Sequence, residues 1–184
     1  KETVWDSDAK VVLNGKLEQT ISGDGFTVPE LTLTNHSEGG IDFQSTVQVN
    51  GTLHTDKDVK IGSSGLKLNG TVDGDTVNGN LTVLSLKDAE LLTLSGTLSF
   101  GEQGVIRNST LQIGKNLNLG NGTVQLEDTV LKVQGGIGSN GATAELNAGS
   151  TIMADGNERI SALTLQQGSI QIGGDAAISQ FSGA

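Results

Sequence analysis

The chain has no cysteine and no tyrosine, and only one proline (Pro29), one tryptophan (Trp5) and four phenylalanines among its 184 residues. No disulfide and no cysteine-ligated metal can form. The lack of cysteine fits a cytosolic protein, and it equally fits a surface protein exported through an oxidising compartment. Five aromatic residues are too few to build an aromatic core, and we therefore expect an aliphatic interior. We expect Trp5 and Phe26 to pack at an irregular first coil.

Positive charge is also scarce. Lys and Arg number 11 against 21 Asp and Glu, which gives a net charge of −10. This balance disfavours nucleic acid and anionic membrane surfaces as partners, because both repel an acidic protein. No apolar stretch reaches the roughly 20 residues of a membrane helix, so we predict no membrane insertion of this segment. The start at Lys1 and the end in mid-repeat at Ser182-Gly183-Ala184 indicate one segment, residues 1–184, of a longer chain.

A short phrase returns along the sequence. It reads Val49-Asn50-Gly51-Thr52-Leu53, Leu68-Asn69-Gly70-Thr71-Val72, Leu94-Ser95-Gly96-Thr97-Leu98 and Gly120-Asn121-Gly122-Thr123-Val124. The four central glycines are 19, 26 and 26 residues apart. Repeats in this range are typical of stacked structural units.

Between the glycines, apolar residues alternate with polar ones in runs of three to six. Examples are 31–33, 47–49, 66–68, 111–113, 117–119, 131–133 and 170–172. Period two predicts strands with one apolar face. We therefore expect Leu68, Leu94, Leu119 and Val133 to point inward and Lys67 to point outward. The one helix-like stretch, 86–92, is interpreted as a turn that enters a strand.

The turns are rich in Gly and Asn. Six Asn-Gly pairs occur, at Asn14, Asn50, Asn69, Asn78, Asn121 and Asn140, and each glycine can adopt a positive φ cheaply. Such pairs also favour an antiparallel hairpin meander. A coil of three short strands explains both the turns and the returning phrase, so the sequence favours a parallel β-helix. Roughly 22 strand candidates give about seven or eight coils, about 35 Å long. Asn50, Asn69 and Asn121 are expected to form a side-chain ladder.

No sequence motif indicates a catalytic or metal-binding site. The two histidines, His36 and His54, lie in polar contexts without a nucleophile turn, and we interpret both as solvated. They are also too few for a zinc site. Asp56/Asp58 and Asp73/Asp75 supply paired carboxylates, but neither pair continues as a calcium-binding loop. The stretch 135–140 is similar to a calcium-binding nonapeptide, but that motif works only in tandem and Ala142 replaces its aliphatic residue.

Enzymes built on β-helices remain an alternative. Pectate lyases combine a carboxylate cluster with a basic residue, and the two arginines here, Arg107 and Arg159, adjoin no such cluster, since Glu158 is single. Two carboxylates brought together by stacking of the coils would make a glycosidase pair. Our prediction is no enzyme, with no catalytic residue, no metal and no cofactor, and with no ligand-binding residue assigned.

Taken together, the glycine- and asparagine-punctuated aliphatic repeats, the acidic balance and the lack of cysteine resemble the passenger region of bacterial autotransporters (type V secretion). Leu-Ser-Gly-Thr-Leu at 94–98, Thr-Leu-Gln-Ile-Gly at 110–114 and Gly-Thr-Val-Gln-Leu at 122–126 are most similar to the AIDA-like and antigen 43-like adhesin branch. The resemblance is one of texture over nearly the whole chain. It implies a right-handed parallel β-helix on the outer surface of a Gram-negative cell. Filamentous haemagglutinin-like secreted adhesins share the texture.

The expected function follows from this resemblance and from the shape. Passengers of this family serve in adhesion, autoaggregation and biofilm formation, and a rod would bind host-cell or matrix glycans and proteins, or another passenger, through many weak contacts. A second hypothesis is that the segment is a structural stem or the stable folding core of the passenger. The third is a polysaccharide-active lyase or glycosidase.

Overall fold

The structure is a computed structural model that describes residue 6 and residues 8–156 and 158–183. These residues form strands and turns without any helix. The strands are β1 (Lys10–Leu13), β2 (Gln19–Ile21), β3 (Phe26–Leu33), β4 (Ile41–Phe43), β5 (Val47–Thr55), β6 (Ile61–Ser63), β7 (Leu66–Asp73), β8 (Thr76–Val77), β9 (Leu81–Lys87), β10 (Leu92–Leu94), β11 (Leu98–Ile113), β12 (Leu117–Asn118), β13 (Thr123–Val133), β14 (Ile137–Leu146), β15 (Thr151–Ala154), β16 (Glu158–Leu165), β17 (Ser169–Ile172), β18 (Ala176–Ile178) and β19 (Phe181–Gly183).

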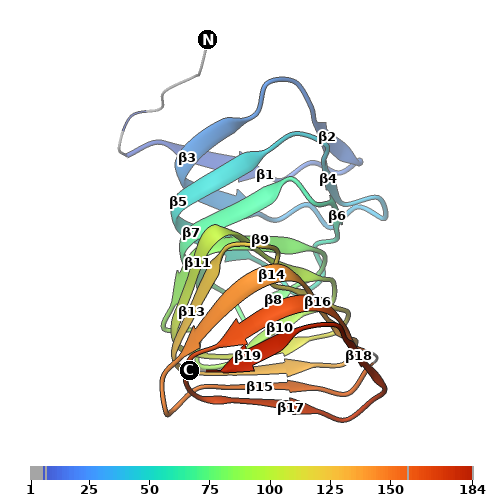
Figure 1. Ribbon diagram of the computed structural model, residues 1–184. Helices are drawn as coiled ribbons and strands as arrows, with labels where there is room; N and C mark the ends of the chain where they lie inside the picture. The colour runs from blue at the N-terminus through green and yellow to red at the C-terminus, as the bar shows by residue number, and fades with distance from the viewer. Residues whose placement is uncertain (1–5, 7, 157, 184) are drawn as a thin grey trace.

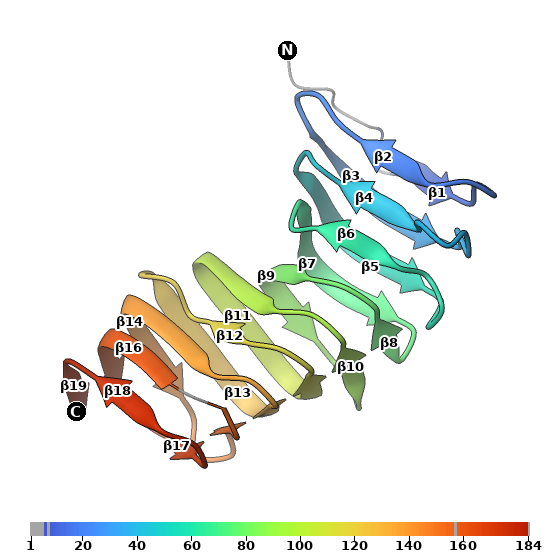
Figure 2. The same cartoon turned by 90° about the vertical axis from the view of Figure 1, so that its right-hand side faces the viewer.

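The strands stack as a parallel β-solenoid. Every strand pair found among the described residues is parallel, which confirms the all-β, parallel β-helix prediction and excludes the hairpin meander. The described part makes about nine turns, slightly more than predicted from the sequence. Figures 1 and 2 show these turns stacked from the N-terminal β1 to the C-terminal β19, along a curved axis.

Each turn presents three faces. In one turn, face 1 holds residues 47–49, face 2 holds 52–55 and face 3 holds β6. Face 3 is interrupted once: β2, β4 and β6 form a separate three-stranded sheet, linked to the next turn by an isolated bridge between Lys60 and Asn78. The long strand β11 runs across two corners and contributes to all three faces, whereas β13 and β14 each run across one corner.

The interior is aliphatic, as the composition required. Leu68, Leu94 and Leu119 are fully buried, and Val133 is 2% exposed, so all four inward-facing predictions are confirmed. Phe26 packs against the core in the second turn, while Trp5 lies outside the described residues. The stretch between β9 and β10 is a turn, as predicted.

The returning phrase serves two different corners. Gly51, Gly70 and Gly122 lie between faces 1 and 2, whereas Gly96 lies between faces 3 and 1, above Gly79. The spacing between copies of the phrase is therefore not always one turn. The true repeat is set by the strand register and varies: Gln48 pairs with Lys67, and Lys67 then pairs with Thr82 after a shorter stretch of chain.

The role predicted for the Asn-Gly pairs is largely wrong. Of their six glycines only Gly141 has a positive φ, of 96°. In four others, Gly51, Gly70, Gly79 and Gly122, an added Cβ would collide with a backbone carbonyl of the preceding turn. These glycines are needed because two backbones approach closely at the corner, not because the chain turns left-handed.

The asparagine ladder is shorter than predicted. Asn69 donates from Nδ2 to Asn50 Oδ1 at 3.2 Å, which confirms that pair. In the next turn, however, the partner of Asn69 is Ser85, so Asn121 does not continue the ladder. The turn after Lys67 is short and shifts the register, so the hydroxyl of Ser85 stands where another asparagine amide would continue the ladder.

Candidate functional site

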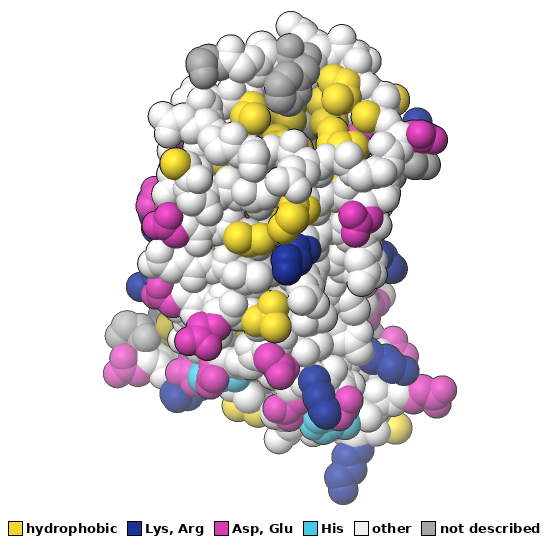
Figure 3. Space-filling model, turned by 90° about the horizontal axis from the view of Figure 1, so that it is seen from below, with side chains coloured by type: hydrophobic (Ala, Val, Ile, Leu, Met, Phe, Trp, Pro, Cys, Tyr) yellow, Lys and Arg dark blue, Asp and Glu magenta, His cyan; other side chains and the backbone are white. Residues whose placement is uncertain are grey.

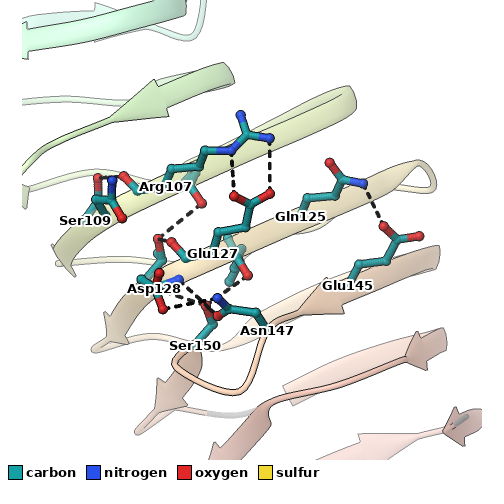
Figure 4. Close-up of polar contacts among 12 residues, drawn as sticks. Arg107, Ser109, Gln125, Glu127, Asp128, Glu145, Asn147 and Ser150 are labelled. Atoms are coloured by element: carbon teal, nitrogen blue, oxygen red, sulfur yellow. Dashed lines mark hydrogen bonds and ion pairs between the residues drawn. The ribbon is translucent and has the colours of Figure 1, made fainter.

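A connected polar surface lies on face 2, where β11, β13 and β14 run side by side (Figure 4). Arg107 and Glu127 stand opposite each other in the register. Arg107 donates from Nε to Glu127 Oε2 at 2.8 Å and from a terminal nitrogen to Oε1 at 3.1 Å. This two-pronged pair raises the pKa of the guanidinium and lowers the pKa of the Glu127 carboxyl. Glu127 is therefore held ionised and is unsuited to act as a general acid.

A shallow depression of about 240 Å³ adjoins this ion pair. Gln125, Glu127, Glu145, Asn147, Gln166 and Gln167 line it. Gln125 donates from Nε2 to Glu145 Oε2 at 2.7 Å, across the two strands. The depression offers amide donors and carboxylate acceptors in neighbouring rows, which suits hydroxyl-rich or amide-rich partners more than apolar ones.

An alternating ladder of Asp and Asn borders this surface at the corner between faces 2 and 3. Asp88, Asn108 and Asp128 have positive φ angles of 58°, 47° and 48°, the left-handed conformation that these two residue types tolerate. Asn108 donates to Asp88 Oδ1 at 3.3 Å, and Asn147 donates to Asp128 Oδ1 at 3.1 Å. The backbone N–H of Asp128 in turn donates to Asn147 Oδ1 at 3.0 Å. These bonds fasten the turn of Asp88 to the turn of Asn108, and the turn of Asp128 to the turn of Asn147.

A row of hydroxyl groups lies just inside the same corner. Ser109, Thr129 and Ser150 are buried. Ser109 accepts from the N–H of Ala89 and Ser150 accepts from the N–H of Thr129, each at 3.1 Å. The hydroxyls of Ser109 and Thr129 donate to backbone carbonyls, as in Ser109 Oγ to Arg107 O at 2.6 Å, and Ser150 Oγ lies within hydrogen-bond distance of Leu126 O and Asn147 Oδ1. These hydroxyls satisfy corner backbone groups and are not nucleophiles awaiting a base.

His54 is not the solvated turn residue that the sequence suggested, whereas His36 is exposed in a loop between β3 and β4, as predicted. His54 lies within β5, and its Nε2 is 2.9 Å from Glu30 Oε1 while its Nδ1 is 2.7 Å from Asp73 Oδ2. Lys10 contacts the same Glu30 oxygen at 2.8 Å, and that hydrogen bond is the main reason the pKa of Glu30 is lowered. His36 is 3.2 Å from Asp56. Both histidines thus bridge neighbouring turns.

In each carboxylate pair considered for calcium, one member contacts a histidine. Asp56 lies against His36, and Asp73 lies against His54. Within the described part of the chain, no three His, Cys, Asp or Glu side chains come together in a way that would hold a metal ion. The stretch 135–140 leads into and forms the start of β14, and Ala142 is buried in that strand.

One carboxyl group lies inside the core. Glu158, at the start of β16, is 1% exposed and accepts a hydrogen bond from the N–H of Ile137, while its Oε1 has no partner among the described residues. It occupies the position that Leu98, Leu117 and Ile137 fill in preceding turns. Burial raises the pKa of Glu158, because the charged form is poorly solvated there.

This burial predicts a pH-dependent stability. A carboxyl whose pKa is raised in the folded state stabilises the fold most below its unfolded pKa, and the contribution is lost as pH rises through the folded value. Glu158→Gln keeps the acceptor for Ile137 and cannot ionise. We expect it to raise the free energy of unfolding by about 1 kcal/mol at pH 8 and to change little at pH 4. Denaturant titrations at both pH values test this, and equal effects at the two would contradict it.

Sequence reasoning missed the cross-turn partners. Arg107 and Glu127 are 20 residues apart, as are Gln125 and Glu145, and Asp128 and Asn147 are 19 apart. A search for complementary side chains at that spacing, rather than for adjacent clusters, would have found them.

Comparison with known proteins assigns no family: no protein-family model, no curated protein and no solved structure matches the chain. The described residues also contain no helix of the length and apolarity needed to cross a membrane.

Proposed function

We propose that this chain is part of the passenger of a bacterial autotransporter, of the AIDA-like or antigen 43-like adhesin branch. On this proposal it stands on the outer surface of a Gram-negative cell and acts in adhesion, autoaggregation or biofilm formation. The observation that carries the proposal is the parallel solenoid with an aliphatic core and outward rows of Thr, Asn, Gln and paired charges. The choice of family comes from the glycine- and asparagine-punctuated aliphatic repeats of the sequence.

The surface of the rod supports many weak contacts more than one strong contact. The depression beside Glu127 is shallow, and the carboxylates around it are already paired with Arg107 and Gln125. In the view of Figure 3, acidic and basic side chains are scattered among polar ones, and no continuous basic area is visible on that face. A repeated polar surface of this kind suits glycans, matrix proteins or an identical rod. It suits neither nucleic acid nor insertion into a membrane.

A structural role in folding is a second candidate, favoured by the corner ladders. The Asn–Asp pairs fasten β9 to β11 and β13 to β15, and the hydroxyl of Thr129, which donates to Ile106 O, joins these two halves. A segment held in this way would fold cooperatively and nucleate its neighbours. Catalysis by a general acid has no comparable support, because the hydrogen bonds from Arg107 lower the pKa of Glu127.

Measuring binding at different surface densities of the protein distinguishes the adhesive role from the structural and enzymatic ones. We expect beads that carry the segment at high density to capture cells, or beads that carry the same segment, at least about tenfold better per molecule than beads at low density. Tight capture that does not depend on density would contradict the multivalent proposal. Cooperative refolding without any capture would favour the folding core, and turnover of a polysaccharide abolished by Glu127→Gln or Glu145→Gln would favour an enzyme.

A further inference from the structure

A cavity of about 470 Å³ opens on face 1 where β12, β14 and β16 lie side by side. Thr97, Asn116, Asn118, Gly136, Gly138 and Arg159 line it, and we call it the glycine notch. Gly138 takes the outward position between Asn118 and Arg159 in the register. Because glycine has no side chain, the floor of the notch is bare backbone, with the two asparagines on one side and the arginine on the other.

The asparagines are fixed so that their amide groups can donate. Asn116 Oδ1 accepts from the N–H of Gly136 at 3.1 Å, and Asn118 Oδ1 accepts from the N–H of Gly120 at 3.0 Å. With the oxygens engaged, each Nδ2 keeps two N–H donors, and neither has a partner in the part of the chain that the structure describes. The notch therefore presents donors and few acceptors.

Arg159 differs from Arg107 in having no acidic partner among the residues that the structure describes. Arg107 is clamped by Glu127, whereas Arg159 is exposed and forms no ion pair with any described carboxylate. The outward row to which it belongs contains no acid: Thr27, Gln48, Lys67, Thr82, Ser99, Asn118, Gly138, Arg159 and Ala177. On a chain of net charge −10, an outward row without acids that contains Arg159 makes the notch locally attractive to an anion.

We propose that the glycine notch binds an acidic sugar residue, a carboxylate or sulfate group carried on an otherwise neutral saccharide. The guanidinium of Arg159 pairs with the anionic group, whose planar or tetrahedral oxygens fit its fork of donors. The amides of Asn116 and Asn118 donate to sugar hydroxyls, and the ring rests against Gly136 and Gly138. The net charge of the chain disfavours densely charged polyanions, so the ligand carries isolated charges.

This inference rests on the proposed function for its biological setting, but a soluble ligand tests it separately. The probes are 3′-sialyllactose, 3′-sulfolactose and lactose, and the readout is the shift of the backbone amide signals of Gly136 and Gly138 in NMR titrations of the whole chain. We expect one or both acidic sugars to shift these signals and lactose to bind at least about tenfold more weakly, as expected when a charge-assisted hydrogen bond is lost. Comparison of 3′-sialyllactose with 3′-sulfolactose shows whether the notch prefers a carboxylate or a sulfate group. A failure of bead capture would contradict the proposed adhesive function and leave sugar binding at the notch standing. A failure of sugar binding would contradict only the notch proposal.

Three variants locate the site. Arg159→Gln removes the cation, and Gly138→Val fills the floor; an added Cβ there has no protein atom nearer than 4.0 Å, so the strand accepts it. Both should weaken binding of the acidic sugar by about tenfold or more. Lys67→Gln removes the same charge from the same row, far from the notch, and should leave binding unchanged. Absence of binding at 10 mM (roughly the weakest useful affinity), equal loss in Lys67→Gln, or binding untouched by Arg159→Gln would each overturn the proposal.

Discussion

Leu94→Asp is expected to destabilise the solenoid by about 4 kcal/mol or more, and to abolish folding if the chain is only marginally stable. Leu94 in β10 is fully buried and lies in the register between Val77 and Ile113. The substitution removes an aliphatic side chain from this row and places a carboxyl group where neither a cation nor water can solvate it. Denaturant unfolding followed by circular dichroism measures the loss.

The matched control is Lys67→Asp. Lys67 is the middle residue of a buried–outward–buried triplet in β7, so its side chain faces solvent while Leu68 beside it is fully buried. We expect this change to alter the free energy of unfolding by no more than about 0.5 kcal/mol. Similar losses at positions 67 and 94 would mean that the alternation of inward and outward residues has been misinterpreted.

Alternation made the fold predictable because it depends only on the chemistry of neighbouring residues. Triplets such as 66–68 and 131–133 place two aliphatic side chains on one face, and burying that face drives the strand into the core. The same logic correctly excluded a helix over 86–92. The number of turns was less predictable, because the corners vary in length and copies of the returning phrase occur at two different corners: Gly70 lies between faces 1 and 2, and Gly96 lies between faces 3 and 1.

The contacts between polar side chains on the surface were harder to predict from the sequence than the buried core, for a physical reason. In a solenoid the neighbours of a side chain are one turn away, and the turn length changes locally. The stretch of chain that separates Lys67 from its partner Thr82 is clearly shorter than the stretch from Arg107 to Glu127, so no single spacing would have paired all the rows. His54 was misjudged for the same reason: the carboxylates on either side of it belong to Glu30 and Asp73 in the two adjacent turns.

The glycines at the corner between faces 1 and 2 show why the phrase returns at all. An added Cβ at Gly70 would overlap the backbone of Gly51 in the preceding turn, and an added Cβ at Gly51 would overlap the carbonyl of Pro29. Stacked backbones at this corner leave no room for a methyl group. Glycine here maintains the contact between turns, and the Asn50–Asn69 pair spans the same corner.

Gly70→Ala is therefore expected to cost about 2–3 kcal/mol, although alanine is ordinarily well tolerated in place of glycine. The φ of Gly70 is not positive, so the cost comes from the overlap with Gly51 and not from a strained conformation of residue 70 itself. The overlapped atoms are backbone, so they yield only if the two turns separate, and that separation weakens the hydrogen bonds between β5 and β7. Hydrogen exchange should show this as faster exchange of the amides in β5 and β7, with little change in the distant β13.

Gly138→Ala is the control that separates this mechanism from a general effect of glycine replacement. Gly138 also has no positive φ, but the nearest atoms to an added Cβ, Asn118 Oδ1 and Leu117 O, are 4.0 Å away. The methyl group fits, and the unfolded chain loses conformational freedom, so we expect this variant to be neutral or to gain up to about 0.5 kcal/mol. If thermal and denaturant unfolding gave the two variants the same stability, close approach of the backbones would not be what requires glycine in the repeated phrase.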